Sequence, residues 1–315
     1  MELRRGDGHV VAVEVVGEPD ATPVLLCHGL ADSRLAALWF QGAARDLGLR
    51  VIAPDRPGTG GTDPRRISRL ADWAEDAALV LDALQVRSVA LLGISGGGPF
   101  AAACAAAIPG RVRSLMLVSP LGSPGWPTRG MAPGERLSLA LATRAPGLGG
   151  WSLGRLAALA RRRPELFLRL AATSLPDIDT RALREPDMRE SFLASYLEAF
   201  RQGSWGASQD LRVLTRPWGF DLSSINVPVL IQHGDADTTV PLQHARLYAQ
   251  AIPGARLQIQ AGHGHFSILS TATAALAALA EQTPATQTPP PAGQPGARRR
   301  AGPGLPAATR RAIRA

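Results

Sequence analysis

The sequence predicts an α/β fold in which helices cover both faces of a mostly parallel sheet. Short apolar runs alternate with segments of helical spacing over residues 10–118 and again over residues 227–279. This alternation is typical of parallel strands that are buried on both faces. With 315 residues and 45% hydrophobic content, the chain is also long enough to bury a full core.

The expected strands are short runs rich in valine, leucine and isoleucine. In chain order they are Val10–Val16, Val24–Cys27, Arg50–Ala53, Val86–Leu92, Arg113–Val118, Val227–Gln232 and Arg256–Gln260. A final helix is expected over Ser267–Leu279. From about residue 121 to residue 222 the strand-like runs stop, and Leu153–Leu170 and Met188–Phe200 place apolar residues at helical spacing, which predicts a helical insertion.

The net charge of +8 is concentrated at the C-terminus. Residues 282–315 contain six arginines and no acidic residue, which leaves +2 on the rest of the chain. This segment is rich in Pro, Ala, Gly and Thr and lacks apolar periodicity, so we expect a disordered, solvated tail. Binding of its arginines to nucleic acid or to an anionic membrane is the alternative, and no nucleic-acid partner is expected.

Three features predict a cytoplasmic protein. The first residues lack the basic and apolar regions of a secretory signal. The stretch Ser88–Ile108 is uncharged, but Gly96-Gly97-Gly98-Pro99 at its centre would break a membrane helix, so no membrane span is expected. Cys27 and Cys104 are too few for a disulfide framework and are expected as buried, reduced side chains. The oligomeric state is left open.

The segment Gly93-Ile94-Ser95-Gly96-Gly97 is the most informative part of the chain. It follows an apolar strand and precedes a stretch of small residues, Pro99–Ala107, which is the strand-to-helix context of a G-x-S-x-G nucleophile elbow. Glycines are needed there because side chains would clash where the helix crosses the strand. The turn would raise the Ser95 hydroxyl to the edge of the sheet as a candidate nucleophile.

Three further polar segments follow expected strands. They are His28-Gly29-Leu30, Gly234-Asp235-Ala236-Asp237 and Gly264-His265-Phe266. Counting from Ser95, the polar groups come in the chain order Ser, Asp, His. The carboxyl ends of parallel strands meet at one edge of a sheet, so we expect these groups to lie close together.

These motifs resemble the α/β-hydrolase superfamily, in its cap-bearing branch of small serine hydrolases, over about residues 9–278. Asp55-Arg56-Pro57-Gly58-Thr59-Gly60 is similar to a loop of that family. The resemblance implies an α/β-hydrolase fold: a mostly parallel eight-stranded sheet with a helical cap inserted after the sixth strand. It divides the chain into core (1–120), cap (121–222), core (223–281) and tail (282–315).

The resemblance also implies the roles of the site residues. Ser95 would be the nucleophile and His265 its base; His265 is preferred to His263 because it matches the family's G-H-F loop. Asp237 would orient the histidine, and Asp235 would structure the loop. Of the other histidines, His28 is expected to be structural, and the remaining three, His9, His233 and His244, are expected at the surface or at strand ends.

The backbone amides of Leu30 and Gly96 are expected to form the oxyanion hole, again by resemblance. Loss of one such donor typically costs about 3 kcal/mol of transition-state stabilisation. Asp55 is expected to anchor a loop rather than to react. The sequence contains no metal-ligand spacing and no phosphate-binding signature, so no cofactor and no metal are expected.

These residues favour hydrolysis of a small carboxylic ester through an acyl-enzyme. A carbon–carbon bond hydrolase, a cofactor-free perhydrolase or haloperoxidase, and a receptor-like member with vestigial hydrolysis fit the same residues. A proline iminopeptidase is disfavoured because its usual elbow has Trp where this chain has Gly96. The cap segment holds most of the aromatic residues, which favours an apolar small-molecule substrate: Trp126, Trp151, Phe167, Phe192, Tyr196, Phe200, Trp205, Trp218 and Phe220.

Overall fold

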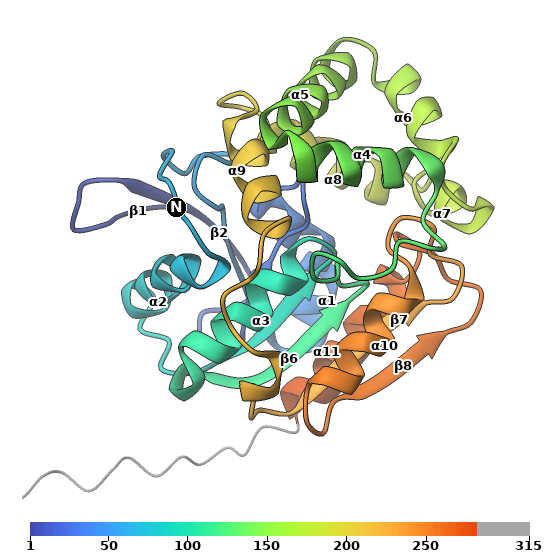
Figure 1. Ribbon diagram of the computed structural model, residues 1–315. Helices are drawn as coiled ribbons and strands as arrows, with labels where there is room; N and C mark the ends of the chain where they lie inside the picture. The colour runs from blue at the N-terminus through green and yellow to red at the C-terminus, as the bar shows by residue number, and fades with distance from the viewer. Residues whose placement is uncertain (282–315) are drawn as a thin grey trace, which may run out of the picture. The chain divides into compact units, whose positions relative to one another are not determined.

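A central eight-stranded sheet organises the protein, as predicted (Figure 1). The computed structural model describes residues 1–281, and the predicted tail lies outside them. The strands are β1 (Glu2–Arg4), β2 (Val10–Val16), β3 (Thr22–Cys27), β4 (Leu49–Pro54), β5 (Val89–Ile94), β6 (Val112–Val118), β7 (Val229–Gly234) and β8 (Arg256–Gln260). Their order is β1-β2-β4-β3-β5-β6-β7-β8. β2 pairs antiparallel with both β1 and β4, and the other pairs are parallel.

The first strand is the one that the sequence analysis did not predict. β1 has three residues, two of them exposed, and pairs only with β2 at the edge of the sheet. A strand this short has no room for an alternating pattern, so it carries little signal in the sequence.

The middle of the sheet alternates between two apolar layers. In β5, Val89 and Leu91 point to one layer, and Ala90, Leu92 and Ile94 point to the other. All six residues of this strand are buried. This is the two-residue period of a strand covered on both sides, which explains why its sequence is continuously apolar.

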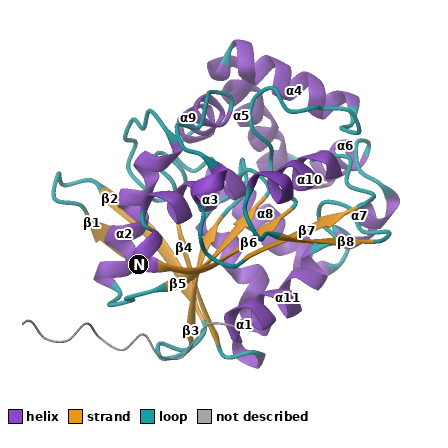
Figure 2. Ribbon diagram, turned by 60° about the horizontal axis from the view of Figure 1, so that its bottom comes forward, coloured by secondary structure: helices purple, strands orange, loops and turns teal. Residues whose placement is uncertain are grey.

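Helices cover both layers (Figure 2). The flanking helices are α1 (Gln41–Asp46), α2 (Ala74–Ala83), α3 (Gly97–Ala107), α10 (Leu242–Ala251) and α11 (Leu269–Glu281). Short 3-10 turns lie at Arg34–Phe40, Leu70–Trp73, Pro109–Arg111 and Leu222–Ser224. Trp73, Phe100 and Tyr248 fill one layer, and Phe40 and Leu276 belong to the other.

The insertion after the sixth strand is entirely helical in the described chain. It contains α4 (Pro133–Arg144), α5 (Pro146–Arg162), α6 (Pro164–Ala172), α7 (Asp177–Ala182), α8 (Pro186–Ala199) and α9 (Trp205–Leu214). We call residues 133–214 the helical region. In Figure 1, α4, α5, α6 and α8 gather on one side of the sheet, away from α10 and α11.

Proline sets the boundaries within the helical region. The apolar run Leu153–Leu170 is split between α5 and α6, because Pro164 begins α6 and Arg163 before it is not helical, at φ −144° and ψ 70°. Proline suits the first turn of a helix but disfavours helical geometry in the residue before it. Within residues 1–281, no helix has the length and apolar character needed to cross a membrane.

Candidate active site

Ser95 lies in a sharp turn between β5 and α3. Its backbone is in the left-handed region, at φ +53°, which is strained for a residue with a side chain. The glycines around it are required by close packing: a Cβ on Gly97 would lie 2.0 Å from the Cys27 carbonyl oxygen, and one on Gly93 would lie 2.7 Å from the Cβ of Ala101. The Ser95 amide donates to the Val118 carbonyl at 2.9 Å, which fixes the turn to the end of β6.

The structure brings together the three side chains that the sequence analysis selected. Ser95 Oγ lies 3.0 Å from His265 Nε2, and His265 Nδ1 lies 2.8 Å from Asp237 Oδ2. His265 and Asp237 are buried, whereas Ser95 is half-buried and faces a cavity. The three groups therefore form one continuous hydrogen-bonded chain from the cavity to a buried carboxylate.

The electrostatics of this chain favour a protonatable histidine. Burial alone would lower the pKa of His265, but the charge and hydrogen bond of Asp237 raise it above its usual value. The pKa of Asp237 is lowered, because the interactions with His265 outweigh its burial. The carboxylate thus stays ionised and stabilises the imidazolium form.

Asp237 is fixed by its own loop. Its Oδ1 accepts hydrogen bonds from the amides of Thr239 and Val240, both at 2.8 Å, which leaves Oδ2 for His265. Asp235 instead accepts from the Gly262 amide at 2.7 Å. The two aspartates of the motif therefore divide the roles of orienting the histidine and structuring the loop.

The amides of Leu30 and Gly96 lie together beside Ser95. A Cβ on Gly96 would be 2.9 Å from the Leu30 nitrogen, and both residues line the same cavity as Ser95. Within residues 1–281, neither amide donates a hydrogen bond to another protein atom. Two unused donors beside a serine hydroxyl can stabilise a negatively charged oxygen.

A cavity of about 340 Å³ opens above these groups. Its wall is mainly aliphatic and includes Leu30, Leu121, Leu139, Leu153, Leu211 and Leu214. Residues from the sheet edge and from the helical region line it together. Such a site suits a small, largely apolar molecule held by a few polar groups.

The family model for the alpha/beta hydrolase fold matches residues 22–272 of this chain. The chain belongs to the α/β-hydrolase family. The matched span contains Ser95, Asp237 and His265, and the eight-stranded, mostly parallel sheet described above agrees with the fold that the resemblance implied.

The hydrolase is similar to relatives with different activities. It is 28% identical to a 2-hydroxymuconate semialdehyde hydrolase of Pseudomonas putida, covering 78% of this chain and 81% of that one. It is 29% identical to a poly(3-hydroxyalkanoate) depolymerase of Ectopseudomonas oleovorans, covering 82% and 83%.

Solved structures show the same fold at lower identity. An esterase from Rhodococcus sp. superposes with a TM-score of 0.65 at 23% identity, covering 90% of this chain and 99% of that one. A bromoperoxidase from Bacillus anthracis gives 0.66 at 22% identity, covering 87% and 96%.

Arg56 holds the loop of the hydrolase that carries the Leu30 amide. The guanidinium is fully buried and donates to the carbonyls of His28 and Gly29, each at 2.7 Å. It also pairs with Asp210 of α9 at 2.7 Å and stacks over the Phe100 ring. The sequence analysis gave Arg56 no role of its own and missed Asp210. No local pattern links two residues so far apart in the chain.

Of two further histidines of the hydrolase, one lies at a strand end as expected and the other lies deeper than expected. His233, at the end of β7, is fully buried and lies 3.4 Å from the Asp237 carboxylate. His244, in α10, is also buried and accepts a hydrogen bond from the Gly122 amide at 2.9 Å. The expectation of a surface or strand-end position is wrong for His244, because the amphipathic face of α10 turns this ring toward Trp126. His263 is half-buried and bonds within its own loop to the Ser267 carbonyl.

The aromatic residues of the insertion do not form the cavity wall as expected. Of those named above, only Phe192 and Tyr196 line it. Trp126 and Trp218 pack against Tyr248 below, and Trp151 is 61% exposed. The apolar character of the cavity was predicted, but it comes from leucines, because composition does not reveal the direction in which a side chain points.

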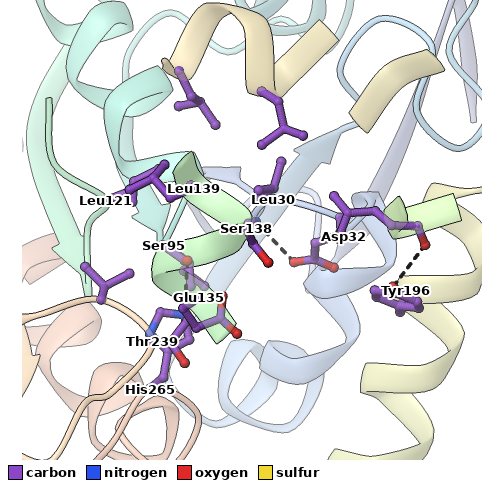
Figure 3. A pocket seen from close by; sticks show the side chains of 18 of the residues that line it. Leu30, Asp32, Ser95, Leu121, Glu135, Ser138, Leu139, Tyr196, Thr239 and His265 are labelled. Carbon is purple, nitrogen blue, oxygen red and sulfur yellow. Dashed lines mark hydrogen bonds between the residues drawn. The ribbon is translucent and has the colours of Figure 1, made fainter. Parts of the chain in front are cut away.

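One acidic side chain of the helical region faces the reacting groups. Glu135 of α4 lines the cavity and lies beside Ser95 and His265 (Figure 3). In residues 1–281 it has no hydrogen-bond or ion-pair partner, and burial raises its pKa. The other cavity carboxylate, Asp32, accepts hydrogen bonds from the amides of Gly29 and Ser33. Among the described residues, no arginine lines this cavity.

Proposed function

We propose that this α/β hydrolase cleaves a small, mainly apolar carboxylic ester through an acyl-enzyme on Ser95. The observation that carries the proposal is the hydrogen-bonded chain from Ser95 through His265 to Asp237, next to the unused amides of Leu30 and Gly96. This is the set of groups that acyl transfer requires: a nucleophile, a base, an orienting carboxylate and an oxyanion site.

In this mechanism, His265 Nε2 accepts the Ser95 proton as Oγ attacks the ester carbonyl. The carbonyl oxygen becomes an oxyanion and accepts hydrogen bonds from the Leu30 and Gly96 amides. His265 then gives the proton to the alkoxide as the ester C–O bond breaks and the alcohol leaves. A water molecule repeats the sequence on the acyl-enzyme, which releases the carboxylic acid and restores the Ser95 hydroxyl.

The charged side chains of the cavity favour ester hydrolysis over the main alternative, carbon–carbon bond hydrolysis. The heptadienoate substrate in the name of another relative, a 2-hydroxy-6-oxo-2,4-heptadienoate hydrolase of Pseudomonas putida, carries a carboxylate. In this chain the described cavity residues include two acidic side chains, Glu135 and Asp32, and no arginine, so the carboxylate of an anionic substrate would find no cationic side chain to pair with. A neutral ester fits better. Ester-cleaving relatives, a depolymerase of a polyester and an esterase, support the same reaction.

A labelling and turnover experiment tests the proposal. A fluorophosphonate probe should label the wild-type protein at Ser95 and fail to label Ser95→Ala. A series of p-nitrophenyl esters should show repeated turnover with an optimum at short to medium acyl length. Each buried methylene contributes about 0.8 kcal/mol until the cavity is full.

The alternatives give different results in the same assays. Cleavage of a 2-hydroxy-6-oxodienoate at a higher kcat/KM than any ester would favour carbon–carbon hydrolysis. Peroxide-dependent bromination that exceeds esterase turnover would favour the perhydrolase. Labelling or binding without repeated turnover would favour a receptor.

A further inference from the structure

The loop that carries His265 is bound by a carboxylate from the helical region. Asp179 of α7 is fully buried, and its Oδ2 accepts a hydrogen bond from the His265 amide at 2.6 Å. Its Oδ1 accepts from the Phe266 amide at 3.0 Å and from both the amide and the hydroxyl of Ser267 at 2.9 Å. One side chain therefore satisfies four donors of a loop that lies 86 residues away in the chain.

The glycine before His265 is shaped by this contact. A Cβ on Gly264 would lie 2.2 Å from Asp179 Oδ2, and the three nearest atoms to that position all belong to Asp179. The backbone of Gly264 does not need the left-handed region. The glycine is thus required by the approach of the carboxylate rather than by the conformation of the loop.

The charge of Asp179 is stabilised by the loop itself. In residues 1–281 no ion pair involves this side chain, so its partners are the backbone amides and the Ser267 hydroxyl. Hydrogen bonds to an ionised acceptor are about twice as strong as neutral ones. The charge also acts on the imidazole, because Asp179 is among the groups that raise the pKa of His265.

We propose that Asp179 is a positioning residue for His265, through which the helical region fixes both the place and the charge surroundings of the proposed catalytic base. The inference rests on the role of His265 given under the proposed function. Its consequence is that a displacement of α7 from the histidine loop would switch off the base without touching Ser95.

The first test is Asp179→Asn. The asparagine oxygen still accepts from Phe266 and Ser267, but the charge is lost and its NH₂ group faces the His265 amide. We expect kcat on a p-nitrophenyl ester to fall by about 10- to 100-fold, the cost of a small misplacement of a catalytic group. KM should change little, because Asp179 does not line the cavity.

The pH profile separates positioning from mere structural support. The base must be neutral, so kcat/KM of the wild type should rise with pH through an imidazole pKa that lies above its usual value. Loss of the Asp179 charge should move this acid limb to lower pH. A lower rate with an unmoved acid limb would overturn the proposed effect on basicity.

The matched control is Asp177→Asn. Asp177 lies in the same first turn of α7 but is exposed and makes no contact with the histidine loop in the described chain. It should keep the wild-type rate and acid limb. An equal loss in both variants would mean that α7 matters only as a helix, and would overturn the inference.

A double-mutant cycle tests the contact itself. Gly264→Ala should lower kcat at least about tenfold in the wild type, but less than about twofold in the Asp179→Ala background, where the obstructing carboxylate is gone. If the two substitutions lowered kcat by independent factors, the proposed contact between Gly264 and Asp179 would be contradicted. If Asp179→Asn does not fold, as checked by circular dichroism, Gly264→Ala carries the test alone, and wild-type activity in that variant would contradict the inference.

Proton NMR of the His265 ring gives a readout that does not depend on the reaction. Its pKa should be lower in Asp179→Asn than in the wild type, even if no ester is turned over. Absence of ester turnover in the wild type with this shift present would reject the proposed function and keep the inference. Ester turnover in the wild type without a change of the His265 pKa in Asp179→Asn would keep the proposed function and reject the inference.

Discussion

The loops that carry Ser95 and His265 are fixed by different kinds of hydrogen-bond partner. The Ser95 turn is fixed by backbone groups of the sheet and its next helix: Ser95 N donates to Val118, and Ser95 O accepts from Gly98 and Leu121, both at 3.0 Å. In the His265 loop, by contrast, the amides of His265 and Ser267 donate to one side chain of the helical region, Asp179. The nucleophile is thus part of the core, whereas the base is completed from outside it.

This difference predicts which substitutions will disturb each loop. Backbone hydrogen bonds survive a change of side chain, so the serine turn is sensitive mainly at its glycines. A loop held by a carboxylate is sensitive at that carboxylate. The predictions below test this contrast, from the largest expected effect to the smallest.

Removal of either reacting side chain should abolish activity. Ser95→Ala and His265→Ala should each lower esterase kcat by at least about three orders of magnitude, because nucleophile and base act as one unit. Steady-state kinetics would measure this, and circular dichroism would check folding. His263→Ala is the control and should be mild, since His263 bonds within its own loop. The reverse ranking of the two histidines would assign the base to His263.

A methyl group at the serine turn should damage the fold itself. In Gly97→Ala the new Cβ meets the Cys27 carbonyl, a backbone atom that cannot move away. We expect a loss of about 3 kcal/mol or more in the free energy of unfolding. Urea denaturation measures it. Gly110→Ala, which has open space around its Cβ, is the control. A Gly97→Ala protein as stable as the wild type would show that the core does not hold this turn rigidly.

The cavity carboxylate should set charge selectivity. Glu135→Gln should raise kcat/KM for a monoester of glutaric acid by about tenfold relative to a neutral ester of equal length, because an ionisable acid that lines the cavity is replaced by a neutral amide. Glu165→Gln, on the exposed face of α6 and paired with Arg189, is the matched control. If the ratio of the two rates does not change, Glu135 does not face the substrate.

Deletion of residues 282–315 should have the smallest effect. Every described residue that lines the cavity falls between Gly29 and Leu269. Hydrolysis of a small ester and the melting temperature should therefore stay near those of the full chain. A large drop in either would mean that the predicted tail contributes to the folded protein.

The sequence analysis succeeded where a signal is local. The eight-stranded sheet follows from the alternating apolar runs and the motifs at strand ends, and the two side chains that these motifs select, Asp237 and His265, lie within hydrogen-bond distance of each other. It missed three residues that act across the chain, because nothing in the sequence around them marks a partner more than 80 residues away: Arg56, Asp179 and Asp210. It also missed Glu135, because the sequence does not reveal that this side chain faces the cavity. It also placed too many aromatics over the site, since periodicity predicts a helix but not which neighbour its faces meet.

The buried pair of Arg56 and Asp210 has a consequence for engineering. Asp210 supports the loop of the Leu30 amide through Arg56, and Asp179 contacts the histidine loop directly. A chimera that exchanges residues 133–214 for those of a relative without acids at these two positions would strip both loops of their carboxylates and leave Arg56 as a buried, unpaired cation, which costs several kcal/mol. Swapping this region to change specificity therefore succeeds only if the donor brings an acid to each of the two positions.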